Sequence, residues 1–414
     1  MQYGTWLLSR IRRQLWWQAI LSVVLGIATA LIATVSDRFF PWSLPIEVSR
    51  EAVDSLLNII ASSMLAVTTF SLGAVTSAFG AATSNVTPRA TKLLMEDKVT
   101  HNVLSTFIGS FIFSIVGIIV LRTGSYGDEG RAVLFVITIL VIALIVVQLL
   151  RWINHLISLG RVGTTIDRVE AATWEAIELR LSVPYLGANP WRDDTLPAGA
   201  TPILSGQIGY LQFVDISALS RLCETHGLTA YLPVNAGSFC YENTVLMYAV
   251  GPIDNETRSR LLDQFVIAAN RTFDQDPRFG LAVMAEVASR ALSPATNDPG
   301  TALDVIGRQT RLLAQWGKGR EDAEVEYPNL YVSPLSDADL FEDAFMLPAR
   351  DGAHLIEIQL RLQKSLFALQ QSGSPAFRAA ARQQGEMAYQ RAKIALTAPC
   401  DLQRLESEFA EDHK

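Results

Sequence analysis

SLLNIIASSMLAVTTFSLGAVTSAFGAATSNVTP, residues 55–88, decides the fold, because no charged side chain interrupts the chain between Asp54 and Arg89. About 20 apolar residues in a helix cross a hydrocarbon core of roughly 30 Å, so these 34 residues are more than long enough to span a membrane. The stretch therefore indicates an integral membrane protein, and a transmembrane helix is expected over about 55–84.

Three further charge-poor stretches accompany this one in the first 160 residues. Each is long enough to cross a bilayer, and helices are expected over about 15–36, 101–121 and 132–156. The expected fold class is thus an α-helical membrane protein with four transmembrane helices over 1–160, followed by a cytoplasmic α+β domain.

The positions of the basic residues predict the orientation of these helices, since short cytoplasmic loops carry an excess of Lys and Arg. Three basic clusters precede the first helix, follow the second and follow the fourth: Arg10, Arg12 and Arg13; Arg89, Lys92 and Lys98; Arg151, Arg161 and Arg168. The other two loops show no basic excess. Both termini are therefore expected in the cytoplasm.

Hydroxyl side chains recur every seven residues along the second helix: Ser55, Ser62, Thr69, Thr76 and Thr83. Seven helical residues fall about 20° short of two full turns, so these hydroxyls form one slowly drifting stripe. Small and hydroxyl residues allow close packing between helices, which is one interpretation. The other is a polar pathway, in which hydroxyls replace part of an ion's hydration shell. The two interpretations are compatible.

The rest of the chain is acidic and reads as a mixture of strands and helices. Residues 1–160 carry 11 basic and 8 acidic side chains, which leaves 23 basic and 33 acidic for 161–414. This balance argues against nucleic acid as a partner, because neutralising phosphates needs a basic face. We expect a helical extension and Pro/Gly linker over 161–200, a small β-unit over 201–252 and a helical domain over 253–414.

Short elements are predicted within these regions. Strands are expected over Ile208–Val214, Leu228–Val234 and Val245–Val250, and helices over Ile216–His226, Glu256–Thr272, Gly280–Ala291, Pro299–Trp316, Ala353–Gln371 and Ala376–Ala398. The fourth transmembrane helix is expected to continue as a helix through Val169–Leu181, and Asp337–Asp343 to be solvated surface.

Two short motifs are candidate sites outside the stripe. One comprises Ser293, Pro294, Asn297, Asp298, Pro299 and Thr301. Its oxygen atoms gather at a helix start and can contact a ligand, but an Asp cap followed by Pro in the first turn explains the same residues. The other is Pro88-Arg89, where Arg89 either contacts lipid phosphate or pairs with an acidic group of the following domain and couples that domain to the helix.

Three stretches together resemble a widespread bacterial family of predicted four-span membrane proteins catalogued as a domain of unknown function. They are residues 84–89, the Gly206–Asp215 strand with the later Ala236-Gly237 turn, and ALSPATNDPGTA at 291–302. The resemblance covers nearly the whole chain. It implies a bacterial plasma (inner) membrane protein with an intracellular domain, and it supplies no agreed activity.

No catalytic or metal motif is present. The five histidines are never three or four residues apart, and no phosphate-binding loop, dinucleotide fingerprint or nucleophile elbow occurs. We therefore expect no enzymatic activity, no cofactor and no metal site.

Two hypotheses for the function follow. The first is a homo-oligomeric channel or pore for small ions, because four helices are too few to enclose a pathway in one subunit. The second helix would line it, and the cytoplasmic domain would regulate it. The alternative is a membrane-anchored binding or regulatory scaffold without a pore. The lipid bilayer is a partner in both hypotheses, and nucleic acid in neither.

Overall fold

The structure is a computed structural model and describes residues 20–28, 49–95, 97–123, 128–192, 195–319 and 324–412. The chain divides into two compact units. The membrane unit takes in the described residues up to Ser84 together with Thr91–Thr164. The C-terminal unit takes in Asn85–Ala90 and the chain from Thr165 onward. The short segment 85–90 therefore belongs to the C-terminal unit although membrane-unit residues precede and follow it.

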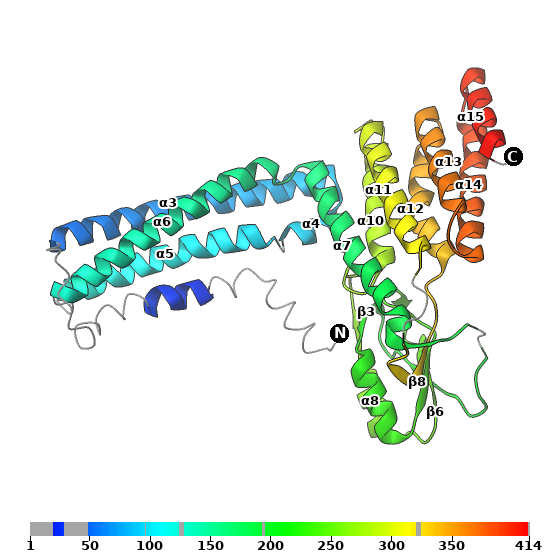
Figure 1. The fold of residues 1–414 in the computed structure, drawn as a ribbon, viewed down its shortest axis with the longest axis horizontal. Helices are drawn as coiled ribbons and strands as arrows, with labels where there is room; N and C mark the ends of the chain where they lie inside the picture. Colours follow the sequence, from blue (N-terminus) through cyan, green and yellow to red (C-terminus); the bar gives the residue numbers. More distant parts are fainter. Residues whose placement is uncertain are drawn as a thin grey trace. The chain divides into compact units, whose positions relative to one another are not determined.

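Long apolar helices make up the membrane unit, and Figure 1 shows three of them, α3, α5 and α6, lying lengthwise together. The labelled elements here are α3 (Arg50–Asn85), α4 (Pro88–Met95), α5 (Lys98–Arg122) and α6 (Asp128–Ser158). Three helices of the described residues are long and apolar enough to cross a membrane: Arg50–Ser84, Lys98–Arg122 and Gly130–Ser158. The predicted helices over 55–84, 101–121 and 132–156 are therefore confirmed as candidate spans.

The predicted first span, 15–36, lies mostly outside the described residues, as do Arg10, Arg12 and Arg13. Residues 20–28 of it are helical. They approach α5 closely, because a Cβ on Gly26 would stand 2.8 Å from the carbonyl oxygen of Gly109. Small residues at such crossings are typical of helices packed within a membrane. The total of four spans stays a prediction.

A shared apolar core joins α3, α5 and α6. Ile60 and Met64 of α3 pack with Phe107 of α5 and with Trp152 of α6, and all four side chains are at most 5% exposed. Through this core, one face of α3 packs against α5 and α6. These two helices do not cover the opposite face of α3.

The fourth span does not run on as one helix, contrary to the sequence-based expectation. Helix α6 ends at Ser158, and α7 begins a new helix over Val162–Ser182. Gly160 lies between them with a φ of +78°, a left-handed conformation that a side chain would strain. A Cβ there would also stand 3.1 Å from the carbonyl oxygen of Ala78, so glycine permits both the turn and the close approach.

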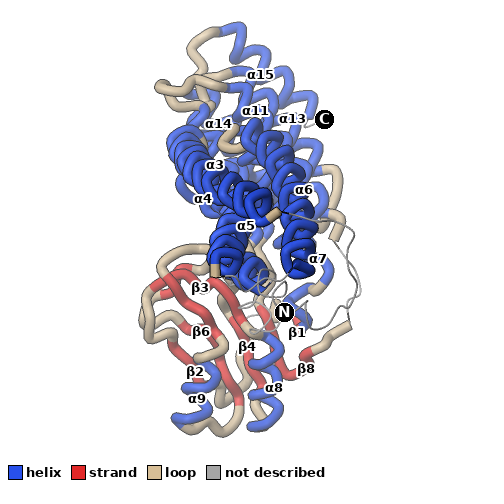
Figure 2. The backbone as a smooth tube through the Cα atoms, turned by 90° about the vertical axis from the view of Figure 1, so that its left-hand side faces the viewer, coloured by secondary structure: helices blue, strands red, loops and turns tan. Residues whose placement is uncertain are grey.

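Two sheets form one half of the C-terminal unit, which Figure 2 shows with helices α8 and α9 beside the strands. One sheet has five strands in the order β1-β8-β4-β6-β2, and the other has three in the order β5-β3-β7. The elements are β1 (Ala188–Pro190), β2 (Thr201–Leu204), β3 (Gly209–Val214), α8 (Ile216–His226), β4 (Thr229–Leu232), β5 (Phe239–Cys240), β6 (Val245–Val250), α9 (Asn255–Leu262), β7 (Phe265–Ala268) and β8 (Tyr327–Val332). Strand β8 runs parallel to β1 and β4, and the other pairings are antiparallel.

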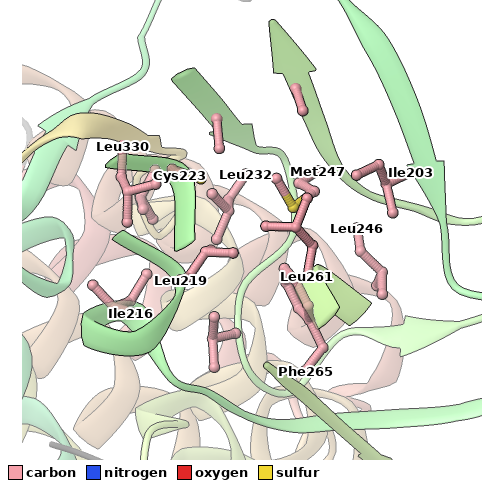
Figure 3. Close-up of a cluster of buried hydrophobic side chains, with 14 of the residues drawn as sticks. Ile203, Ile216, Leu219, Cys223, Leu232, Leu246, Met247, Leu261, Phe265 and Leu330 are labelled. Atoms are coloured by element: carbon pink, nitrogen blue, oxygen red, sulfur yellow. The ribbon is translucent and has the colours of Figure 1, made fainter. Parts of the chain in front are cut away.

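The core of this half lies between α8 and the strands. Leu219 and Cys223 of α8 pack against Leu232, Met247 and other apolar side chains, as Figure 3 shows. All four named side chains are at most 1% exposed.

Helices form the other half of the C-terminal unit and lie side by side in Figure 1. They are α10 (Pro277–Ala291), α11 (Pro299–Gly317), α12 (Asp337–Asp351), α13 (Ile356–Gln370), α14 (Pro375–Ala395) and α15 (Pro399–Asp412). Proline in the first turn begins α10, α11 and α14, where its missing N–H removes no helical hydrogen bond.

The β-region extends beyond the predicted 201–252 on both sides. The expected Pro/Gly linker contains β1, and β2 begins directly after it at Thr201. Both strands are the outer strands of the five-stranded sheet, so Pro190 and Pro202 sit where a strand has a neighbour on one side only. The prolines in this part of the chain, which suggest a linker in the sequence, therefore lie in the edge strands of the sheet.

The region predicted as wholly helical, 253–414, contains two strands. The expected helix Glu256–Thr272 ends at Leu262, and β7 follows as the partner of β3. Strand β8 inserts between β1 and β4. Strand β7 is apolar, whereas β8 also contains Pro328 and Asn329, and the pairing partners of both strands lie far away in the chain.

The acidic stretch Asp337–Asp343 is also not simply surface. Ser336 caps α12 by accepting the backbone N–H of Asp339, and Leu340 and Phe341 are each 1% exposed. The expected single helix Ala353–Gln371 becomes the α12–α13 connection and α13. The acidic side chains occupy one face of a helix whose other face is core.

Candidate functional site: the exposed face of α3 and the segment that follows it

The hydroxyl stripe lies on the face of α3 opposite to the packed one. Val53 and Leu57 are fully buried. Ser55 is two residues from each, which places it about 160° around the helix from both at roughly 100° per residue. The seven-residue period repeats this relation along α3, so one helix has an apolar seam and a hydroxyl stripe on opposite sides.

All five predicted pore-lining residues are exposed: Ser55, Ser62, Thr69, Thr76 and Thr83. The glycines beside them, Gly73 and Gly80, have no atom within 4 Å of where a Cβ would stand. Among the described residues, no helix of the same chain packs against the stripe. Packing within the described part of one subunit therefore does not explain the stripe, whereas packing between subunits and a polar pathway both do.

The stripe presents oxygen acceptors outward. Four of its hydroxyls donate to the carbonyl oxygen one turn earlier, with donor–acceptor distances of 2.8–2.9 Å: Ser62 to Asn58, Thr69 to Leu65, Thr76 to Leu72 and Thr83 to Phe79. A hydroxyl that donates its proton to the backbone keeps its lone pairs. Such an oxygen can accept a hydrogen bond from water or contact a cation.

Helix α6 shows what a lipid-facing surface looks like in this protein. Its exposed large side chains are aliphatic: Val136, Ile139, Leu140, Leu144, Val146, Val147, Leu150, Ile153 and Ile157. The candidate span of α6 has a mean hydropathy of 3.2, against 1.7 for α3. Helix α3 also exposes large apolar side chains, among them Leu65, Phe70 and Leu72, but its hydroxyl stripe has no counterpart among the exposed residues of α6 named above.

The chain after α3 is bound to the C-terminal unit through α10. Val86 and Ala90 are fully buried, and the hydroxyl of Thr87 donates to Glu286 at 3.0 Å. The guanidinium of Arg89 donates to the same carboxylate at 2.6 Å. Exposed ion pairs contribute only about 0–1 kcal/mol, so the ion pair between Arg89 and Glu286 adds little stability and serves mainly to fix the register of the segment on α10.

Pro88 and Arg89 were candidates for coupling, and the structure gives Arg89 an acidic partner. The lipid interpretation of Arg89 stays a prediction, because its side chain remains 59% exposed. Glu286 was not singled out by the sequence. It is one of many acidic residues, and it lies 197 positions away from Arg89 in the chain.

The Asn297–Thr301 motif forms a helix cap. The Asp298 carboxylate accepts the backbone N–H of Thr301 at 3.1 Å and its hydroxyl at 2.6 Å, and these bonds lower the pKa of Asp298. Asn297 precedes it with a φ of +48°, a conformation that asparagine tolerates. Asp298, Pro299 and Thr301 thus begin α11, as expected from the capping interpretation.

The other half of the motif borders a cleft of about 590 Å³. Its lining residues are Ser289, Leu292, Ser293, Pro294, Asn297, Asp351 and His354. The hydroxyl of Ser289 donates to Asp351 at 2.5 Å, and Arg350 pairs with the same carboxylate. Burial raises the pKa of Asp351, but the hydrogen bonds from Arg350 and Ser289 outweigh it and leave this pKa lowered. The cleft has both polar and apolar lining residues, and the charge of its carboxylate, Asp351, is already paired with Arg350.

Comparison with known proteins places the chain among membrane proteins. A family model described as "Predicted membrane protein (DUF2254)" matches residues 12–368. Two relatives are the uncharacterized proteins Mb1321c of Mycobacterium bovis and Rv1290c of Mycobacterium tuberculosis, each 29% identical over 235 residues. The match takes in 54% of this chain and 45% of each relative, so the chain spans about half the length of the relatives it matches. No solved structure matches the chain.

Proposed function

The chain belongs to the DUF2254 family of predicted membrane proteins, and we propose that it forms an oligomeric channel or pore for small ions. Helix α3 lines the pathway, with Ser62, Thr69 and Thr76 nearest the middle of the membrane. The C-terminal unit lies in the cytoplasm and regulates the pore. The membrane is the inner membrane of a bacterium.

The exposed stripe on α3 is the observation that carries this proposal. A membrane helix that faces lipid gains from aliphatic side chains, as on α6, and gains nothing from a line of hydroxyls and glycines. The stripe therefore faces either other protein or water. Subunits arranged around an axis satisfy both conditions, because α3 of each copy then packs beside its neighbour and turns its acceptor oxygens toward the centre.

A scaffold without a pore is the alternative function, and the cleft lined by Ser289 and Asp351 favours it. In this case the stripe serves only to pack one copy against another, and the C-terminal unit recognises a small polar ligand. Both functions need an oligomer, so oligomer formation alone does not separate them.

Ion flux separates the two functions. Purified protein reconstituted in liposomes, verified as a single oligomeric species, is expected to release a trapped small ion such as K⁺ faster than protein-free liposomes. Detection with separate cation-sensitive and anion-sensitive dyes covers both signs of charge. Absence of flux for every ion tested would contradict the pore and leave the scaffold.

Cysteine labelling tests the orientation. Cys223 and Cys240 are buried, and burial raises the pKa of Cys223 to about 12, whereas Cys400 is exposed. A thiol reacts as its thiolate, so a maleimide is expected to modify Cys400 alone in the folded protein and all three cysteines after denaturation.

With intact cells and a membrane-impermeant maleimide, no labelling of Cys400 is expected until the cells are lysed. A Cys400→Ser variant is the control for specificity. Rapid labelling of Cys400 in intact cells would place the C-terminal unit outside and reverse the predicted topology.

A further inference from the structure

We infer that α10 positions the end of α3: the segment Asn85–Ala90 is a docking contact through which the C-terminal unit holds the helix that bears the stripe. This contact adds to the proposed function the element that is regulated, namely α3. Its role in regulation rests on the proposed pore. The contact itself is a structural claim that needs no ion flux for its test.

The path of the chain leads from α3 directly into the docked segment. Helix α3 ends at Asn85, and the docked segment begins at that same residue, so no linker separates the two. A flexible linker would absorb a displacement of the C-terminal unit, whereas a directly continuing chain transmits it. A single turn residue, Val86, separates the end of α3 from Thr87, the first residue that contacts Glu286.

The docked segment is buried and hydrogen-bonded to α10. Val86 and Ala90 are fully buried and Thr87 is 4% exposed, so the segment is packed and is not a surface loop. Glu286 receives hydrogen bonds from both Thr87 and Arg89. Because one carboxylate binds two positions of the segment, it fixes the orientation of the segment on α10.

The face of α10 that contacts the docked segment also borders the cleft that contains Asp351. Glu286 and Ser289 are three residues apart on α10 and lie on one side of it, and Ser293 follows just after the helix ends at Ala291. Glu286 holds the segment, and Ser289 and Ser293 line the cleft that contains Asp351. A shift of α10 caused at the cleft would therefore reach the docked segment within about two helical turns.

Hydrogen exchange of the full-length protein in liposomes tests the contact. In Glu286→Ala, which removes both hydrogen bonds, the amides of residues 81–90 are expected to exchange at least about tenfold faster than in the wild type. Arg89→Gln, which removes one, is expected to give a smaller increase in the same peptides.

Arg311→Gln is the matched control, because Arg311 also pairs with a glutamate at 2.8 Å and is 62% exposed, against 59% for Arg89. It is expected to leave exchange in residues 81–90 unchanged. The reversed pair Arg89→Glu with Glu286→Arg is expected to restore part of the protection, which separates the contact from general destabilisation.

Unchanged exchange in residues 81–90 of both Glu286→Ala and Arg89→Gln would overturn the inference. An equal acceleration in Arg311→Gln would overturn it as well, because the effect would then not belong to this contact. Neither readout depends on whether the protein conducts ions, so failure of the docking contact and failure of the pore are distinguishable.

Discussion

Replacing Thr69 and Thr76 together with leucine is expected to lower ion flux through the reconstituted protein by at least about tenfold, because it exchanges acceptor oxygens at mid-membrane for aliphatic groups. Both hydroxyls are exposed and bonded only to their own helix. Leucine suits a membrane helix, so the protein is expected to insert and assemble normally. The measurement is the initial rate of ion release per oligomer.

Thr106→Leu on α5 is the control for this prediction. Its hydroxyl makes the same kind of bond, to the carbonyl oxygen of Asn102 at 2.8 Å, but it lies off the stripe. Flux near the wild-type value is expected. If the double variant conducts as well as Thr106→Leu does, the pathway does not run along α3, although a channel elsewhere in the oligomer would survive.

Replacing Gly280 with alanine is expected to destabilise the C-terminal unit by about 3 kcal/mol or more. A Cβ on Gly280 would stand 1.9 Å from the hydroxyl oxygen and 2.7 Å from the Cβ of Thr173. Thr173 is fully buried on α7, and its hydroxyl bonds to the carbonyl oxygen of Val169. Neither helix can make room without opening the α7–α10 contact, so the melting temperature is expected to fall by more than about 5 °C.

Gly307→Ala is the matched control, since Gly307 is also inside a helix, α11, and has nothing within 4 Å of the added Cβ. That variant is expected to be neutral or more stable by up to about 1 kcal/mol. Adding Thr173→Gly to Gly280→Ala is expected to recover part of the loss, because it removes the three atoms nearest the new methyl group. Equal melting temperatures for Gly280→Ala and Gly307→Ala would contradict the close packing of α7 on α10.

Elements that carry their own start and stop signals could be predicted from the sequence. Helix α8 has the predicted bounds Ile216–His226, because Asp215 caps it and Gly227 ends it with a φ of +63°. Strand β7 was missed, since Phe265–Ala268 follows α9 without an intervening Gly or Pro, and its strand pairing depends on distant β3. In α12 the many acidic residues suggest a solvated surface, although Leu340 and Phe341 between them are buried.

The candidate site likewise has features that could be predicted from the sequence and features that could not. The period of the hydroxyls, which begins at Ser55, could be read from the sequence, because a helix converts a seven-residue spacing into a stripe. That the stripe faces away from α5 and α6 follows only from the packing of the opposite seam. Glu286 could not be found by pattern, since its role depends on a segment brought to it by the fold.

The central claim is that the α3 stripe of one subunit faces other subunits around a common axis. Cross-linking in membranes tests it most directly, with Thr69→Cys in a Cys400→Ser background and a short bifunctional maleimide. Leu144→Cys, on the aliphatic face of α6, is the matched control. We predict covalent dimers and higher species for Thr69→Cys and none for Leu144→Cys. Cross-linking at Leu144→Cys with none at Thr69→Cys would show that the stripe faces lipid and would contradict the account.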